Sequence, residues 1–136
     1  MKKYRITCNE EQLRLIANSI EDWSRFISGQ CELDNATHMV EPVENMHEVR
    51  DILDKQVRPL IVPDLPYPGS SYGWSGGDCP NDHQRKAIAM SYGIYREIRH
   101  FLAMQHPEDS WNVYLSETLR CPDQGPLIKI EEIEED

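Results

Sequence analysis

A stretch rich in proline and glycine, residues 59–77, constrains the fold of this chain more than any other feature. It contains four prolines and four glycines, a density that interrupts both helices and central strands. Three aromatic residues, Tyr67, Tyr72 and Trp74, lie in the same stretch, whereas disordered linkers contain few aromatics. We therefore expect residues 59–79 to form one long, ordered loop, and such loops often bind ligands or cover a site.

A first helix is predicted well before this loop. From Leu13 onward, apolar residues recur at helical spacing. Asn9, or alternatively Thr7, can cap this helix, and Gln12 has the position that completes a capping box with Asn9. Gly29 is a natural stop for the helix.

Two further helices are expected on either side of the loop. One covers Met46–Val57 and ends at Pro59. Its inward-facing residues are Val49, Ile52 and Leu53. The other begins at Asn81 or Asp82, which are both common capping residues, and runs to about Gln105.

Alternation of apolar and polar residues predicts three strands, Tyr4–Thr7, Trp111–Ser116 and Leu127–Ile133. The order is then a strand, three helices and a hairpin. We therefore expect an α+β fold, in which three helices pack against a small antiparallel sheet made of the N-terminal strand and the C-terminal hairpin. The length of 136 residues fits a single domain, 1–136.

The chain is acidic, with 24 acids against 14 bases and a formal net charge of −10. Residues 31–66 contain eight acids and three bases, and residues 107–136 contain nine acids and two bases, including an acidic tail at 131–136. Such a charge repels nucleic acid at long range, so we expect no direct binding to it. A small anion held in a local basic pocket is still compatible with this charge.

The length of the apolar runs and the spacing of the cysteines indicate where in the cell the protein is expected. No apolar run approaches the roughly 20 residues that a bilayer span requires, so we expect no membrane association. The four cysteines are widely spaced and form no C-x-x-C motif, which favours reduced thiols in the cytoplasm.

Metal binding and catalysis are not expected. Cys79 and His83 have a C-x₃-H spacing, but the second ligand pair of a structural zinc site is missing. Ser75, Cys79 and His83 are the residue types of a nucleophile and its base, yet no strand precedes the G-W-S-G-G sequence as it does in a nucleophile elbow. We therefore predict neither a metal site nor an enzyme.

The loop and the flanking helices instead favour binding of a small, nucleotide-like anion. Free backbone amides before the third helix could hold a phosphate, and arginines that border aromatic residues suit bidentate phosphate binding with base stacking. The candidate ligand-binding residues are Arg25, Gln30, Tyr72, Trp74, Arg85, Tyr95, Arg96, Arg99 and His100. The alternative is that the arginines form ordinary surface pairs with Glu21, Asp22 or Glu97.

Two stretches carry a family resemblance. The first helix ends in W-S-R-F-I-S-G-Q, residues 23–30, and the third contains I-Y-R-E-I-R-H-F-L-A, residues 94–103. The pattern S-R-apolar-x-x-G-Q, followed by Y-x-x-I-R-H-x-L-A and an acidic C-terminal hairpin, resembles a group of small uncharacterised phage and prophage proteins. The Pro-rich stretch and the loop Trp74–Gly77 depart from that pattern.

The resemblance implies an anti-defence protein, because small phage proteins often antagonise host defence. We expect a non-enzymatic protein without a cofactor that sequesters a nucleotide-derived immune signal in the cytoplasm of the host cell. Aromatic residues concentrated near the helix ends and the loop predict a homodimer or a higher homo-oligomer. The alternative, favoured by the acidic segments, is an inhibitor that binds a host defence protein and partly mimics DNA.

Overall fold

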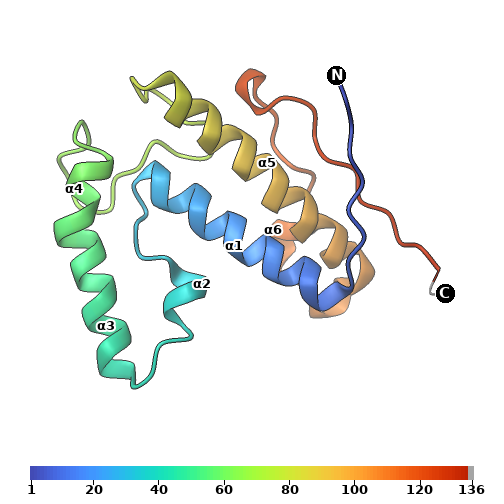
Figure 1. Ribbon diagram of the computed structural model, residues 1–136, viewed down its shortest axis with the longest axis horizontal. Coiled ribbons are helices and arrows are strands. Elements are labelled where there is room, and N and C mark those ends of the chain that lie inside the picture. Colours follow the sequence, from blue (N-terminus) through green and yellow to red (C-terminus); the bar gives the residue numbers. More distant parts are fainter. Residues whose placement is uncertain (135–136) are drawn as a thin grey trace.

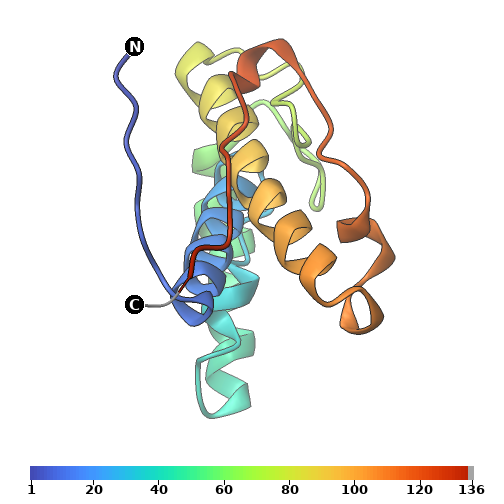
Figure 2. The same ribbon diagram turned by 90° about the vertical axis from the view of Figure 1, so that its right-hand side faces the viewer.

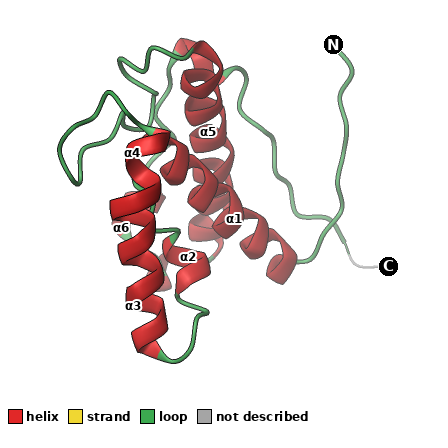
Figure 3. Ribbon diagram, turned by 60° about the vertical axis from the view of Figure 1, so that its left-hand side comes forward, coloured by secondary structure: helices red, strands yellow, loops and turns green. Residues whose placement is uncertain are grey.

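The computed structural model describes residues 1–134, and all regular secondary structure in that range is helical (Figure 3). The predicted α+β fold is therefore wrong, because the described residues contain no strand. The α-helices are α1 (Glu10–Ser28), α2 (Asp34–Thr37), α3 (Val43–Ile52), α4 (Arg58–Ile61), α5 (Asp82–Gln105) and α6 (Asn112–Leu115). A π-helical turn covers Leu53–Val57, and 3₁₀ turns cover Pro107–Asp109 and Pro122–Gln124.

An antiparallel pair of the two long helices, α1 and α5, forms the centre of the molecule (Figure 1). Near the end of α1, the side-chain amide of Gln84 donates to the Ile27 carbonyl at 2.8 Å. Further along, Arg99 Nη2 donates to Asn18 Oδ1 at 2.9 Å. The buried residues of the core cluster between the two helices are Ala17, Ile98 and Leu102.

The long helices begin and end where local sequence signals predicted. Asn9 Oδ1 accepts from the Gln12 backbone at 2.8 Å, and Gln12 Oε1 accepts from the Asn9 backbone at 3.0 Å, which confirms the capping box. Gly29 ends α1 with a φ of 115°, a left-handed conformation that suits glycine. Asn81 caps α5 by accepting from the Gln84 backbone at 3.0 Å.

The second predicted helix differs from the structure at both ends and in orientation. Helical geometry runs from Val43 to Ile61, through the π-helical turn and α4. Pro59 does not end this segment, because it lies in the first turn of α4, where no backbone N–H is needed. Val49 and Ile52, which were expected to face the core, are 36% and 41% exposed. The long loop consequently begins at residue 62 rather than at residue 59.

The second predicted strand is a short helix because side chains of α5 bind its backbone. Arg96 Nη2 donates to the Val113 carbonyl at 2.8 Å. The ring nitrogen His100 Nδ1 lies 2.9 Å from the Tyr114 carbonyl oxygen. These donors satisfy carbonyl groups that a neighbouring strand would otherwise bind, and residues 112–115 form α6.

The first and third predicted strands, Tyr4–Thr7 and Leu127–Ile133, have no regular secondary structure. Tyr4 and Ile6 are 85% and 84% exposed, so these two side chains do not pack against the rest of the protein. Residues 131–134 of the predicted acidic tail are exposed. Its last two residues, Glu135 and Asp136, lie outside the described residues.

The C-terminal segment returns along α5 at a position where that helix carries a glycine. A Cβ atom on Gly93 would lie 2.8 Å from Cγ of Gln124, so a larger residue there would push this segment away. Gln124 is 2% exposed. Thr118 Oγ1 donates to Glu97 Oε2 at 2.6 Å on the same helix. None of the helices in residues 1–134 has both the length and the apolar character needed to cross a membrane.

Candidate functional site

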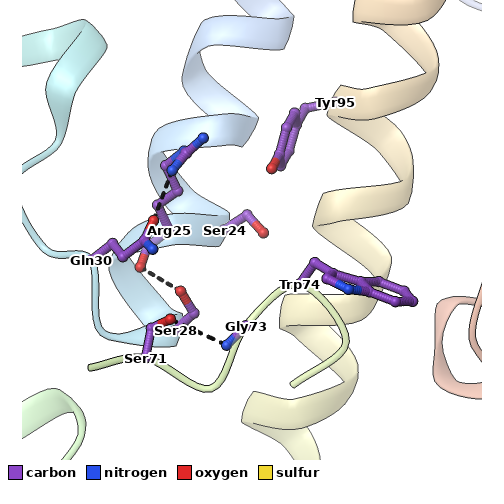
Figure 4. Close-up of a pocket in the computed structure, with 8 residues that line it drawn as sticks. All are labelled: Ser24, Arg25, Ser28, Gln30, Ser71, Gly73, Trp74 and Tyr95. Carbon is purple, nitrogen blue, oxygen red and sulfur yellow. Dashed lines mark hydrogen bonds between the residues drawn. The ribbon is translucent and has the colours of Figure 1, made fainter. Parts of the chain in front are cut away.

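A cavity of about 200 Å³ lies where the end of α1, the long loop and the middle of α5 meet (Figure 4). We call it the α1–α5 pocket. Its lining residues are Ser24, Arg25, Ser28, Gln30, Ser71, Gly73, Trp74 and Tyr95. The structure thus brings together four candidates from three separate segments: Arg25, Gln30, Trp74 and Tyr95.

Arg58 organises the loop that forms one wall of this pocket. Its side chain is buried, with the residue only 4% exposed. Arg58 Nε donates to the Gly29 carbonyl at 3.0 Å, and Nη2 donates to the Tyr67 carbonyl at 2.9 Å. A further bond joins Nη1 to the Leu65 carbonyl at 3.3 Å. No local sequence pattern indicates this role of Arg58, because the carbonyl groups that it binds come from positions up to 29 residues away.

The loop lies directly against the end of α1. The Tyr72 backbone N–H donates to the Ser28 carbonyl at 2.9 Å. A Cβ atom on Gly29 would lie 3.0 Å from the Ser70 carbonyl oxygen, so glycine there both ends the helix and admits the loop. This contact fixes Ser71 and Gly73, the next loop residues, at the mouth of the pocket.

Arg25 is the charged residue of the pocket lining. Its Nη1 donates to Gln30 Oε1 at 2.7 Å, and its Nη2 lies 3.5 Å from Glu21 Oε2. The Arg25 side chain is 43% exposed, so it is held in place and is still open to a ligand. Arg25 and Gln30, which are the arginine and the glutamine of the pattern S-R-apolar-x-x-G-Q, are therefore in direct contact.

Glu21 is not part of the lining of the α1–α5 pocket, but its carboxylate contacts two arginines. Its Oε1 accepts from Arg99 Nη2 at 2.9 Å and from Asn35 Nδ2 at 3.0 Å, while Oε2 faces Arg25. Burial opposes ionisation, but the Asn35 hydrogen bond and the charges of Arg99 and Arg25 outweigh it and hold the pKa of Glu21 below its usual range. Two positive groups thus share one negative group. Pairing with Glu21, which was the alternative to ligand binding, is therefore present for both Arg25 and Arg99, and it occurs within the candidate site.

The aromatic side chains of the site differ in what they offer a ligand. Tyr95 is 7% exposed, and burial raises the pKa of its hydroxyl to about 12, so it stays a neutral donor. In Figure 4 this hydroxyl points toward Ser24 and Arg25. The Trp74 ring instead points away from Arg25 and packs on Tyr92, with ring centroids 5.1 Å apart. Trp74 is therefore poorly placed for the base stacking that was expected of it.

A second cavity, of about 620 Å³, lies beside the start of α1 and the end of α5. It contains Arg99, whose guanidinium lies 5.8 Å from the ring centre of Tyr114. The Arg96 guanidinium lies 5.0 Å from the same ring. Glu21 lines this cavity and contacts Arg25 of the α1–α5 pocket, so one carboxylate connects the two cavities.

The remaining candidates do not line the α1–α5 pocket. Arg85 Nε donates to Asp123 Oδ2 at 2.9 Å and Arg85 Nη1 to Asp82 Oδ1 at 2.7 Å, which fastens the C-terminal segment to α5. Arg96 and His100 bind backbone carbonyl groups within α6, as described above. Tyr72 lies in the loop outside the lining, and burial raises the pKa of its hydroxyl.

The lining of the α1–α5 pocket consists mainly of neutral polar side chains together with Arg25. It contains no His, Cys, Asp or Glu that could act as a general base. The Ser28 hydroxyl donates to the Arg25 carbonyl at 2.8 Å, so it has no base that would activate it. Within residues 1–134, no three His, Cys, Asp or Glu side chains gather as ligands for a metal.

Comparison with protein-family models, with curated proteins and with solved structures finds no match for this chain. A functional proposal for this chain therefore depends on the geometry of the α1–α5 pocket.

Proposed function

We propose that this protein binds a small anionic ligand derived from a nucleotide, holding one of its phosphate groups in the α1–α5 pocket without transforming it. The observation that carries the proposal is the charge balance around Arg25. Arg25 is half-exposed in the pocket, and the carboxylate it contacts, Glu21, is engaged more closely by Arg99. An anion is the partner that would complete this arrangement, since charge-assisted bonds to arginine are among the strongest in proteins.

Neutral donors line the same pocket as Arg25. The Tyr95 hydroxyl, the Gln30 amide and the Ser71 hydroxyl all belong to the lining. A phosphate group has several acceptor oxygens, and each can accept from a different donor of this kind. The residues thus match the chemistry of a phosphate better than that of an apolar ligand.

The volume of the pocket limits how much of the ligand it encloses. About 200 Å³ is less than the roughly 300–1,000 Å³ of a pocket that encloses a drug-sized molecule. A phosphate group fits, while the rest of a nucleotide would remain outside the pocket. The phosphate contacts, rather than base stacking on Trp74, would therefore supply most of the affinity.

The biological role that we propose follows from the resemblance to small phage and prophage proteins. A protein that binds a nucleotide signal tightly, and leaves it unchanged, lowers the free concentration of that signal. In the cytoplasm of a bacterial host, this would weaken a defence pathway that depends on the signal. The proposed role is therefore sequestration, and it requires no catalytic residue.

The test is calorimetric titration of the protein with a panel of cyclic nucleotides and ADP-ribose derivatives, accompanied by thermal melting. We expect at least one panel member to bind and to raise the melting temperature. Arg25→Ala should weaken that binding by about ten- to a hundredfold, because it removes charge-assisted hydrogen bonds worth roughly 1.5–3 kcal/mol. Lys55→Ala is the control. It removes a positive charge that is paired with Asp51 at 2.8 Å, in the segment between α3 and α4.

Three results would contradict the proposal. If wild-type protein binds no member of the panel, a nucleotide-derived ligand is excluded for the compounds tested. If binding occurs and survives Arg25→Ala, the ligand lies elsewhere on the molecule. An equal loss in Arg25→Ala and Lys55→Ala would show a general charge effect rather than a site.

A second candidate function is an acidic inhibitor of a host defence protein, and the position of α3 favours it. Every residue of α3 is exposed or half-buried, including Glu44, Glu48 and Asp51. Figure 3 shows α3 and α4 forming one edge of the molecule. A native mass spectrum of protein purified from host cells distinguishes the two functions. A retained small ligand supports sequestration, whereas a bound host polypeptide at fixed stoichiometry supports inhibition.

A further inference from the structure

The molecule exposes more surface than a folded monomer of its mass. Its accessible surface is 9,894 Å² for a chain of 15.9 kDa. Folded monomers of that mass have about 7,350 Å². The excess is therefore about 2,500 Å², which is larger than the roughly 800 Å² that each partner buries in a standard interface.

The extended segments at both ends contribute to this exposed surface. A further, apolar part of the exposed surface lies on one face of the α1–α5 pair. On α1, Ile16 and Trp23 are seven residues apart and therefore project in the same direction. On α5, Met90 and Ile94 are four residues apart and share a face in the same way. Trp23 is 56% exposed and Met90 is 51% exposed, whereas Ile16 and Ile94 are partly buried against the core. We call this surface the open face.

The open face lies opposite the candidate site. Arg25 follows Trp23 by two residues, which turns its side chain about 200° around the helix. Arg99 follows Ile94 by five residues, which turns its side chain about 140°. Both arginines point to the side of the helix pair that carries the two cavities. The open face and the candidate site are thus independent surfaces.

The chain itself covers the open face in part. Ile130 of the C-terminal segment packs against the core cluster beside Ile94 and Phe101. Figure 2 shows this segment running alongside α5 toward the start of α1. Trp23 and Met90 nevertheless stay half-exposed.

We propose that the open face is a two-fold interface with a second copy of this chain, in which two α1–α5 pairs pack into a four-helix arrangement. A two-fold interface uses the same patch on both partners, so the patch must be compatible with itself. On α1 the open face meets this condition, because the arc from Phe26 through Trp23 and Ile16 to Ala17 contains no charged residue. On α5, Glu97 follows Met90 by seven residues and borders the patch, and its carboxylate accepts from Thr118 at 2.6 Å. Each copy carries a net charge of −10, so a mainly apolar patch can be brought against itself at a lower electrostatic cost than the acidic remainder of the surface.

The test is sedimentation velocity or light scattering from about 1 μM to about 100 μM protein, a range that resolves ordinary dimer affinities. Wild-type protein should have twice the mass of the 15.9 kDa chain. Trp23→Glu and Met90→Glu place a charge in the open face, and each should raise the dissociation constant about 30-fold or more, as expected for a central interface residue. Leu60→Glu is the matched control, because Leu60 is 81% exposed on α4 and lies outside the open face. It should leave the mass unchanged.

Circular dichroism of the variants separates loss of assembly from loss of folding, since Trp23 and Met90 are half-exposed and the variant monomers should stay helical. A wild-type monomer at every concentration would overturn the proposal. A dimer that persists in both Trp23→Glu and Met90→Glu, or that Leu60→Glu disrupts equally, would place the interface elsewhere. Neither outcome would affect ligand binding at the α1–α5 pocket, so this proposal and the proposed function can fail separately.

Discussion

Glu21 is shared by Arg25 and Arg99, and this sharing sets the charge that a ligand meets in the α1–α5 pocket. The side chain of Glu21 is 9% exposed, and that of Arg99 is 17% exposed, so their contact at 2.9 Å is shielded from solvent. Arg25 is more open and lies farther from the carboxylate. The negative charge of Glu21 therefore stabilises the fold through its contact with Arg99, but it also reduces the positive charge that Arg25 offers to an anion.

Replacing Glu21 by Gln should separate these two demands. Glu21→Gln removes the negative charge but keeps the size of the side chain, and we expect it to lower the free energy of unfolding by about 2 kcal/mol. The same change leaves Arg25 with a stronger positive field, so affinity for an anion should rise roughly three- to tenfold. Chemical denaturation and calorimetric titration measure the two effects. Glu10→Gln is the control, because Glu10 forms an exposed pair with Arg14. Parallel losses of stability and affinity would contradict this account.

The pH dependence of the Glu21 effect has a definite sign. The folded protein holds the pKa of Glu21 below its ordinary value of 4.5. The stabilisation is therefore complete above pH 4.5 and disappears as the pH falls through the lowered pKa. The stability difference between wild type and Glu21→Gln should be largest at neutral pH and should shrink in acid.

At the level of elements, the cap and stop signals of α1 predicted the structure correctly, whereas the stop at Pro59 and the alternation patterns did not. The capping box of Asn9 and Gln12 and the stop at Gly29 depend on residues within a single turn, and all three are present. A strand requires a partner elsewhere in the chain, and the alternation at Tyr4–Thr7 says nothing about whether one exists. Segment 111–116 shows the consequence, since side chains of α5 bind its backbone in place of a strand.

The candidate site was likewise predictable only where its residues lie close together in the chain. Arg25 and Gln30 are near neighbours on the chain, and their contact at 2.7 Å follows from the end of α1. Tyr95 is brought to them by the antiparallel packing of α1 and α5. Helical periodicity predicts the two helices but not how they pack against each other. Arg58 could not be identified in this way, because its partners are carbonyl groups spread over residues 29–70.

The long loop should depend on Arg58 more than on its own sequence. Arg58→Lys keeps the charge, but a single ammonium group cannot reach all the carbonyls that the guanidinium binds, so several would remain buried without a donor. We expect a loss of about 2–3 kcal/mol in stability. Limited proteolysis should cut within residues 62–79 before the rest of the chain. Arg14→Lys, at an exposed pair with Glu10, should behave like wild type. Unchanged protease resistance in Arg58→Lys would show that the loop is held by other contacts.

At the level of the whole molecule, net charge opposes the association of two copies, whereas exposed apolar surface favours it. Every copy carries a net charge of −10, so two copies repel each other when they approach. The open face lies on the side of the α1–α5 pair away from Arg25 and Arg99, and it would bring mainly apolar side chains together. Assembly is then driven by burial of apolar surface and opposed by repulsion between charges around the interface.

This balance predicts that salt strengthens the dimer. Raising the ionic strength from about 0.01 M to about 0.15 M shortens the screening length from about 30 Å to about 8 Å, which weakens repulsion between the two acidic copies. The apolar contacts are not screened, so the dissociation constant measured by sedimentation should fall several-fold over this range. Trp23→Glu should weaken the dimer at both ionic strengths, because it adds a carboxylate within the interface itself. A dissociation constant that rises with salt would mean that ion pairs hold the copies together, and the mainly apolar open face could not then be the interface.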